Sequence, residues 1–256
     1  MIKVIFFDVD GTLVSHKDTT VSPSTRAALA ALEQTGIRRV LATGRHSSEL
    51  VNLPVRDIAF DGAVTLNGQL CLDRDGTVFF DNPITGAEKE HLLALFEQKA
   101  LPLLLVERDA MYINFVDERV RLAQEAISTP IPPIGVYTGN PIYQVIAYVG
   151  PQDEALLRAQ LPGCRITRWN PQGIDIIAAT GGNVAGIEAY LSRSGIDRSE
   201  TMAFGDGEND AEMLSFVQLG VAMGNAKDAA KRSADYVTAG VDEDGIAKAL
   251  EHFGLL

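Results

Sequence analysis

A short apolar run that ends in two carboxylates constrains the fold of this chain more than any other segment. Residues 4–7 are Val, Ile, Phe and Phe, and Asp8, Asp10, Gly11 and Thr12 follow almost at once. Such a run, bounded by turn residues, is typical of a fully buried strand in a parallel sheet. In open α/β sheets, ligands bind beyond the carboxyl ends of the strands. We therefore expect Asp8 and Asp10 to lie where the protein does its chemistry.

A helix and a second strand follow this first strand. Ser22 as N-cap and Pro23 at the first helical position predict the start of the helix. Residues 37–41 predict the next buried strand, which runs into Thr43 and Gly44. This β-α-β order predicts a right-handed parallel crossover, so that Thr43 and Gly44 lie at the same sheet edge as the first two carboxylates.

The middle of the chain has a different character. Residues 82–181 predict the element order α, β, β, α, β, α, β, β, and Thr85 with Glu88 predicts a capping box at the first of these helices. This order is typical of a small α+β domain. We therefore predict an α/β protein. A doubly wound, Rossmann-like parallel-sheet core is formed by residues 1–81 and 182–256, and an inserted α+β cap by residues 82–181.

A third strand end carries further polar groups. Residues 200–204 predict a buried strand, and the segment after it contains Asp206, Asn209 and Asp210. In a parallel sheet this end meets the ends that carry Asp8 and Asp10. Four carboxylates so close would repel one another unless a cation neutralised them. An oxygen-only site of this kind suits Mg²⁺.

The composition excludes several classes of protein. Among 256 residues, 34 Asp and Glu face 22 Lys and Arg, which gives a net charge of −12. This balance argues against a non-specific nucleic-acid or membrane binder, although small anionic substrates remain compatible with it. Cys71 and Cys164 form neither a disulfide framework nor a zinc spacing. With no signal peptide and no membrane span in the pattern, we expect a cytoplasmic protein; the oligomeric state is not indicated.

The polar segments together match those of a known family. They are Asp8–Leu13, Thr43–Arg45, Asn67–Gly68, Gly205–Asp210 with Met213–Leu214, and Gly220–Ala226. With these motifs the chain resembles the haloacid dehalogenase-like (HAD) phosphatases. It is most similar to the Cof-type group, which has a large α/β cap of type IIB inserted after the second motif. The resemblance covers the whole chain.

The resemblance implies a role for each carboxylate. Asp8 would be the nucleophile that forms an aspartyl-phosphate, and Asp10 the general acid and base. Asp8, the backbone carbonyl of Asp10, and Asp206 would bind Mg²⁺, and Asp210 would support that binding. The spacing agrees, because residues two apart in an extended strand point to the same side.

The resemblance also implies the phosphate-binding groups and one departure from the family pattern. Thr43 and the N–H of Gly44 would bind phosphate, and Asn209 would reach the phosphate or a metal-bound water. The family has a lysine at the start of the helix before the last catalytic strand. Counting back from Gly195, that position is Asn183, which can donate a hydrogen bond but carries no charge.

These observations predict a Mg²⁺-dependent phosphatase that hydrolyses small phosphomonoesters, such as sugar phosphates, through an aspartyl-phosphate. Its partner would be a small phosphorylated metabolite. Two alternatives stay open: a phosphotransferase or phosphomutase, and a phospho-ligand-binding protein whose turnover is weak because Asn183 replaces the lysine.

Overall fold

The chain folds into two compact units. The computed structural model describes residues 1–127 and 129–256. One unit contains Met1–Phe80 and Asn183–Leu256, and the other contains Asp81–Gly182. The larger unit is therefore built from both ends of the chain. In the part of the chain that is described, no helix is both long and apolar enough to cross a membrane.

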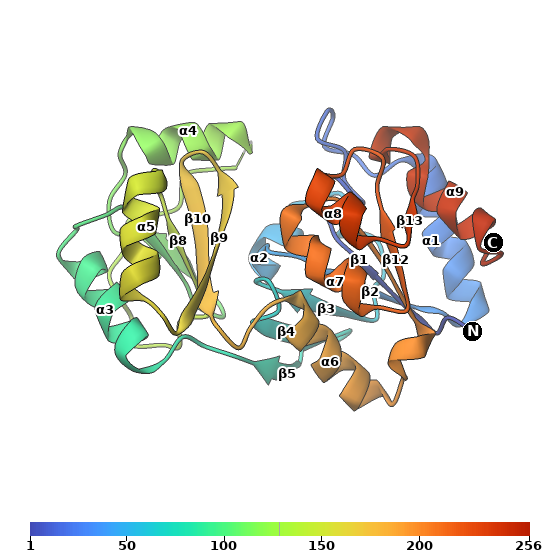
Figure 1. The fold of residues 1–256 in the computed structure, drawn as a ribbon, viewed down its shortest axis with the longest axis horizontal. Coiled ribbons are helices and arrows are strands. Elements are labelled where there is room, and N and C mark those ends of the chain that lie inside the picture. The colour runs from blue at the N-terminus through green and yellow to red at the C-terminus, as the bar shows by residue number, and fades with distance from the viewer. Residues whose placement is uncertain (128) are drawn as a thin grey trace. The chain divides into compact units, whose positions relative to one another are not determined.

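The larger unit is built around an eight-stranded sheet (Figure 1). Its strands are β1 (Val4–Phe7), β2 (Arg38–Ala42), β3 (Gly62–Thr65), β4 (Leu70–Asp73), β5 (Val78–Asp81), β11 (Thr201–Gly205), β12 (Leu219–Ala222) and β13 (Tyr236–Val237). Its α-helices are α1 (Pro23–Thr35), α2 (Ser47–Leu50), α6 (Asn183–Ser194), α7 (Ala211–Phe216), α8 (Asp228–Ser233) and α9 (Gly245–His252). Three short 3₁₀ turns are described as well: η1 (Arg198–Glu200), η2 (Glu208–Asp210) and η3 (Val241–Glu243).

The order of the strands confirms the doubly wound core. The sheet runs β13-β12-β11-β1-β2-β3-β4-β5, and all pairs from β13 to β3 are parallel. From β1 the chain winds outward to β2 on one side and returns to β11 on the other. The four residues of β1 are fully buried in the hydrophobic core, as is typical of a central parallel strand with both faces covered. This arrangement explains why β1 is apolar throughout.

The local signals near the N-terminus are confirmed in part. The Ser22 hydroxyl caps α1 by accepting from the Thr25 N–H, and Pro23 is the first residue of the helix. The second strand, predicted over residues 37–41, forms one residue later, as β2 from Arg38 to Ala42. Before β3, which begins at Gly62, Ile58 and Phe60 pack, partly buried, against the hydrophobic core.

The smaller unit is an antiparallel sheet with helices and has its own hydrophobic core. Its elements are α3 (Gly86–Glu97), β6 (Leu103–Val106), β7 (Met111–Ile113), α4 (Glu118–Ala126), β8 (Gln144–Ala147), α5 (Pro151–Gln160), β9 (Cys164–Asn170) and β10 (Gly173–Ala178). The sheet order is β7-β6-β8-β10-β9. The element order is the predicted one, so the α+β assignment is confirmed.

The capping box predicted at the start of α3 is wrong. The Thr85 side chain makes no capping hydrogen bond. The Glu88 carboxylate instead accepts a hydrogen bond from the backbone N–H of Gly163, at 3.0 Å. A contact that is distant in sequence therefore competes with the local one, which a short motif cannot reveal.

Candidate active site

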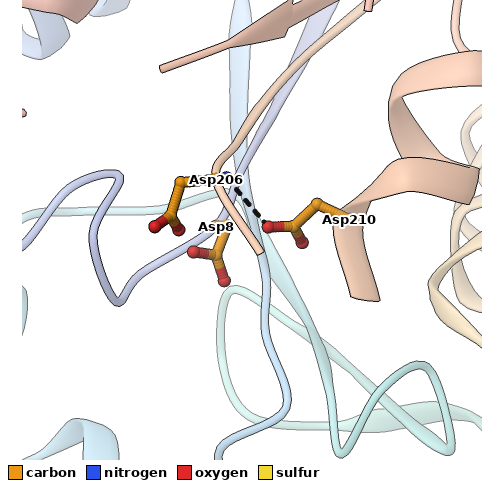
Figure 2. Close-up of side chains that lie close together, drawn as sticks. All are labelled: Asp8, Asp206 and Asp210. Atoms are coloured by element: carbon orange, nitrogen blue, oxygen red, sulfur yellow. Dashed lines mark hydrogen bonds between the residues drawn. The ribbon is translucent and has the colours of Figure 1, made fainter. Parts of the chain in front are cut away.

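Three buried or half-buried carboxylates meet at the carboxyl edge of the larger unit's sheet (Figure 2). Asp8 follows β1, Asp206 follows β11, and Asp210 ends η2. One carboxylate oxygen from each lies within 4.8 Å of the others. Since Phe7 pairs in register with Phe204, the chain leaves both strands at the same height. Parallel pairing thus brings together three of the four predicted carboxylates.

Asp210 is fixed by the backbone of the loop that it closes. Its Oδ2 accepts hydrogen bonds from the N–H groups of Asp206, at 3.0 Å, and Gly207, at 2.8 Å. Its Oδ1 is buried without a hydrogen-bond partner. A Cβ on Gly205 would lie only 2.8 Å from the Asp210 Cγ, so a glycine is required there for this close approach.

Burial and mutual repulsion shape the electrostatics of the three carboxylates. Burial, then the charges of Asp210, Asp206 and Asp10, raise the pKa of Asp8 well above its usual value. Burial raises the pKa of Asp206 to about 6, although the charge of His16 opposes this. Burial also raises the pKa of Asp210 to about 7. The cluster therefore favours protons or a cation over three free negative charges.

The residues present fit a divalent cation such as Mg²⁺. The donor set consists of carboxylate oxygens, which are the hard ligands that Mg²⁺ prefers. The unpartnered Oδ1 of Asp210 is an orphaned buried acceptor, and a metal-bound water would satisfy it. The cluster therefore has both the charge and the free acceptor that a Mg²⁺ site needs.

Asp10 lies apart from the three clustered carboxylates and has a different partner. The Arg45 Nε lies 2.6 Å from Asp10 Oδ2, and its Nη2 lies 2.8 Å from Oδ1. Such a two-point arginine–carboxylate pair fixes the orientation of both side chains. The structure thus places the Asp10 carboxylate against Arg45 rather than in the group that could hold a metal.

Thr43 and Gly44 lie in the turn that follows β2. The Thr43 side chain is buried, and its Oγ1 accepts the backbone N–H of Arg45 at 3.2 Å. Gly44 has so little room that an added Cβ would lie 3.0 Å from Asn67 Oδ1. Both residues are therefore held at the same sheet edge as Asp8, as parallel pairing of β1 and β2 requires.

The two predicted asparagines differ in their surroundings. Asn183 is the first residue of α6 and is only 4% exposed. Neither its Oδ1 nor its Nδ2 has a hydrogen-bond partner. Asn209, in η2, is exposed. A buried amide without partners is costly unless a ligand satisfies it. The surroundings of Asn183 therefore indicate a ligand-binding role more strongly than those of Asn209.

Sequence reasoning assigned no role to two groups that contact Asp206 or to a third that lies near it. The Thr12 hydroxyl donates to Asp206 Oδ1 at 3.4 Å. The Asn225 amide donates to Asp206 Oδ2 at 3.3 Å and to the Gly11 carbonyl at 2.8 Å. His16 lies close by, since a Cβ on Gly11 would meet both its ring and Asp206. The available signal was that Thr12 and Asn225 lie within two of the segments that match the family, Asp8–Leu13 and Gly220–Ala226.

Comparison with known proteins identifies similar sequences and folds. A sequence model of a family described as haloacid dehalogenase-like hydrolase matches residues 5–250. YkrA of Bacillus subtilis (strain 168) is 33% identical over 257 aligned positions, and the alignment covers 99% of this chain and 98% of YkrA.

Two solved structures of phosphatases have nearly the same fold. BT1666 from Bacteroides thetaiotaomicron, from a study of phosphatases of the HAD superfamily, superposes with a TM-score of 0.92 at 33% identity. The match covers 100% of this chain and 96% of that one. BT4131, a sugar phosphatase of HAD subclass IIB, gives a TM-score of 0.88 at 34% identity over 99% of this chain and 100% of that one.

Proposed function

The chain belongs to the haloacid dehalogenase-like hydrolases and is a phosphoric monoester hydrolase, and we propose that it is a Mg²⁺-dependent phosphatase that acts through an aspartyl-phosphate. The observation that carries this proposal is the convergence of Asp8, Asp206 and Asp210 within 4.8 Å at the carboxyl ends of β1 and β11. Such a cluster combines a nucleophile with ligands for a cation.

We propose that Asp8, the backbone carbonyl of Asp10, and Asp206 hold Mg²⁺, with Asp210 supporting them. The bound ion would offset negative charge between the Asp8 carboxylate and the phosphoryl oxygens. The hydrogen bonds from the backbone N–H groups of Asp206 and Gly207 keep Asp210 in place. Asp210 would thereby fix the loop that carries Asp206.

In the first proposed step, an Asp8 carboxylate oxygen attacks phosphorus and the bond from phosphorus to the ester oxygen breaks. Asp10 gives its proton to the departing alkoxide, so an alcohol leaves and an aspartyl-phosphate remains. In the second step, Asp10 takes a proton from water, which attacks phosphorus. The bond to Asp8 breaks, phosphate is released, and both carboxyl groups return to their starting state.

We propose that the phosphoryl group is bound by Thr43, the N–H of Gly44, Asn183 and Asn209. The unpartnered amide of Asn183 supports this assignment, because a phosphoryl oxygen would satisfy its Nδ2. Thr43 supplies a hydroxyl, and Gly44 supplies a backbone N–H.

We propose sugar phosphates or similarly small phosphorylated metabolites as substrates. The support is the 34% identity to the sugar phosphatase BT4131 over the full length of both chains. The inserted domain, residues 82–181, would select among leaving groups. The net charge of −12 supports a role without nucleic-acid or membrane partners. We also propose a cytoplasmic location.

A second candidate function rests on Asn183. Its amide is buried, uncharged and unpartnered, where the family has a lysine. Loss of that charge would favour a protein that binds a phosphate ester tightly and turns it over weakly. This candidate predicts stoichiometric binding of a phosphomonoester without release of phosphate.

The test is phosphate release from a panel of phosphomonoesters, measured with Mg²⁺ and with EDTA. We expect release that needs Mg²⁺ and disappears in Asp8→Asn. Asp57→Asn is the control, because Asp57 pairs with Arg26 on the exposed surface. Activity that survives Asp8→Asn contradicts the mechanism, and binding without release supports the second candidate.

A further inference from the structure

Different basic side chains lie near different carboxylates of the site. Burial raises the pKa of Asp206, and the charges of His16 and Lys227 lower it. The His16 ring and the Lys227 side chain therefore act on the loop after β11. Arg45 instead makes a two-point contact with Asp10. Burial lowers the pKa of Arg45, but its hydrogen bonds and charge interactions, which include one with Asp8, raise it overall.

The position where the family has a lysine cannot supply a charge in this chain. Asn183 is 4% exposed, neutral, and without a hydrogen-bond partner for either polar atom. Attack by Asp8 on a phosphoryl group brings negative charges together, and a positive group nearby stabilises that arrangement. A chain with Asn183 therefore needs its positive charge from another side chain.

Arg45 is built into the site in a way that suits this task. Its side chain is only 19% exposed and lies between two carboxylates. Besides the contacts with Asp10, its Nη1 lies 3.5 Å from Glu49 Oε1. These three contacts use three of the five N–H groups of a guanidinium, which leaves two for an incoming phosphoryl oxygen.

Resting on the proposed function, we propose that Arg45 supplies the positive charge that a lysine at the position of Asn183 supplies in the family. Asp10 and Glu49 hold the guanidinium in place, and its remaining N–H groups stabilise the phosphoryl group as Asp8 attacks. Asn183 contributes hydrogen bonding alone. The proposal makes Arg45 and a lysine at position 183 interchangeable sources of charge.

Interchangeability is tested by a double-mutant cycle with Arg45→Gln and Asn183→Lys. Since hydrogen bonds to charged groups are strong, we expect Arg45→Gln to lower kcat roughly 10- to 100-fold. The proposal requires Asn183→Lys to raise kcat at least about tenfold more in the Arg45→Gln protein than in the parent protein. Equal effects of Asn183→Lys in both backgrounds overturn the proposal.

Arg26→Gln provides a matched control, because Arg26 also contacts both oxygens of an aspartate, Asp57, but on the surface. We expect it to leave kcat unchanged and to show no coupling with Asn183→Lys. Melting temperatures identify any variant that fails to fold. If a variant of the cycle fails to fold, Arg45→Lys is compared with Arg45→Gln instead. Arg45→Lys keeps the positive charge and should retain a higher kcat than Arg45→Gln. Equal losses of kcat in the two variants overturn the proposal.

The choice of leaving group separates a charge role from a role exerted only through Asp10. With p-nitrophenyl phosphate the leaving group needs little protonation, so the loss in Asp10→Asn should shrink compared with an alkyl phosphate. The loss in Arg45→Gln should be similar for both substrates. If it disappears with p-nitrophenyl phosphate, Arg45 only positions Asp10 and the proposal is wrong.

A parent protein without phosphatase activity contradicts the proposed function but still leaves Arg45 testable. The same cycle is then measured as the dissociation constant of inorganic phosphate in the presence of Mg²⁺. We expect weaker binding in Arg45→Gln and recovery when Asn183→Lys is added. Absence of recovery overturns the role of Arg45 independently of turnover.

Discussion

The carboxylate of Asp210 accepts the backbone N–H of Asp206 at 3.0 Å, across the turn that links them (Figure 2). The same oxygen also accepts the N–H of Gly207, while the other carboxylate oxygen is buried and unpartnered. One oxygen of this carboxyl group therefore holds the loop, while the other makes no hydrogen bond. This division lets the structural and electrostatic roles of Asp210 be separated by experiment.

Asp210→Asn keeps an oxygen that can accept both N–H groups but removes a buried negative charge. We expect the metal-free protein to become more stable, because repulsion with Asp8 and Asp206 falls. Stabilisation by saturating Mg²⁺, about 2.7 kcal/mol at a hundredfold excess over Kd, should shrink. Melting temperatures in EDTA and in Mg²⁺ measure both effects.

Asp235→Asn is the control for this change, because Asp235 accepts the backbone N–H of Gly220 at 2.8 Å and lies outside the carboxylate cluster. It should leave the Mg²⁺-induced shift in melting temperature unaltered. An undiminished shift in Asp210→Asn would show that the charge of Asp210 does not support metal binding.

The raised pKa values make the stability of the metal-free protein depend on pH. Burial raises the pKa of Asp206 to about 6 and that of Asp210 to about 7, from 3.8. The folded state then binds more protons than the unfolded state between pH 4 and 7, so stability falls as pH rises. In EDTA, the urea midpoint should be higher at pH 5 than at pH 8.

Mg²⁺ should reverse this trend, since it binds the deprotonated carboxylates that become available as pH rises. With saturating Mg²⁺ the midpoint at pH 8 should approach or exceed that at pH 5. Asp210→Asn, which lacks one of the titrating groups, should show a weaker pH dependence in EDTA. A midpoint in EDTA that rises from pH 5 to pH 8 contradicts this account.

The sequence was sufficient to predict the elements that place the carboxylates. A fully apolar β1 can only be a central strand, and parallel pairing then brings the residues after β1, β2 and β11 to one edge. The order of elements in residues 82–181 could also be predicted, because each strand and helix there has its own periodicity and its own turn residues. Local pattern and global fold agree in these segments.

Side-chain partners were not predictable, because they depend on which loops meet. Arg45 follows Thr43 and Gly44 in sequence, yet its contact with Asp10 depends on the geometry of two separate turns. Asn225 reaches back to Gly11 across 214 positions. The absence of any partner for Asn183 is likewise a property of the packed interior. No sequence motif specifies which side chains from separate loops meet.

Asn225 links three loops, and its removal should weaken both the fold and the metal site. Its amide donates to the Gly11 carbonyl at 2.8 Å and to Asp206 Oδ2 at 3.3 Å, and its Oδ1 accepts the Val241 N–H at 2.8 Å. Asn225→Ala leaves these groups unpaired, which should cost about 1–3 kcal/mol of unfolding free energy.

The half-saturating Mg²⁺ concentration should also rise, roughly 3- to 10-fold, as Asp206 loses a hydrogen bond that orients it. Titration calorimetry with Mg²⁺ measures this change without turnover. Asn52→Ala is the control, since Asn52 is exposed and its side-chain amide makes a long contact with the Ser48 carbonyl, at 3.5 Å. Destabilisation with unchanged Mg²⁺ affinity would restrict Asn225 to a structural role.

Gly11 and Gly76 form a matched pair that separates backbone strain from damage to the site. Both have φ near +81°, where an L side chain is strained. A Cβ on Gly76 would have nothing within 4 Å, whereas one on Gly11 would overlap the Asp206 carboxylate. Replacement by alanine should therefore cost each protein about 1 kcal/mol of unfolding free energy from the backbone alone.

Only Gly11→Ala should also change the chemistry. The added methyl group must displace both the Asp206 carboxylate and the His16 ring, which lies 2.8 Å from its position. The Mg²⁺-induced rise in melting temperature should therefore shrink, and phosphate release should fall at least about tenfold. Gly76→Ala should keep both, since its effect is confined to an exposed turn. Urea denaturation gives the backbone cost in each variant, and calorimetric titration gives the Mg²⁺ affinity. Equal Mg²⁺ affinity in the two variants would show that the tight approach of Gly11 to Asp206 does not position that carboxylate.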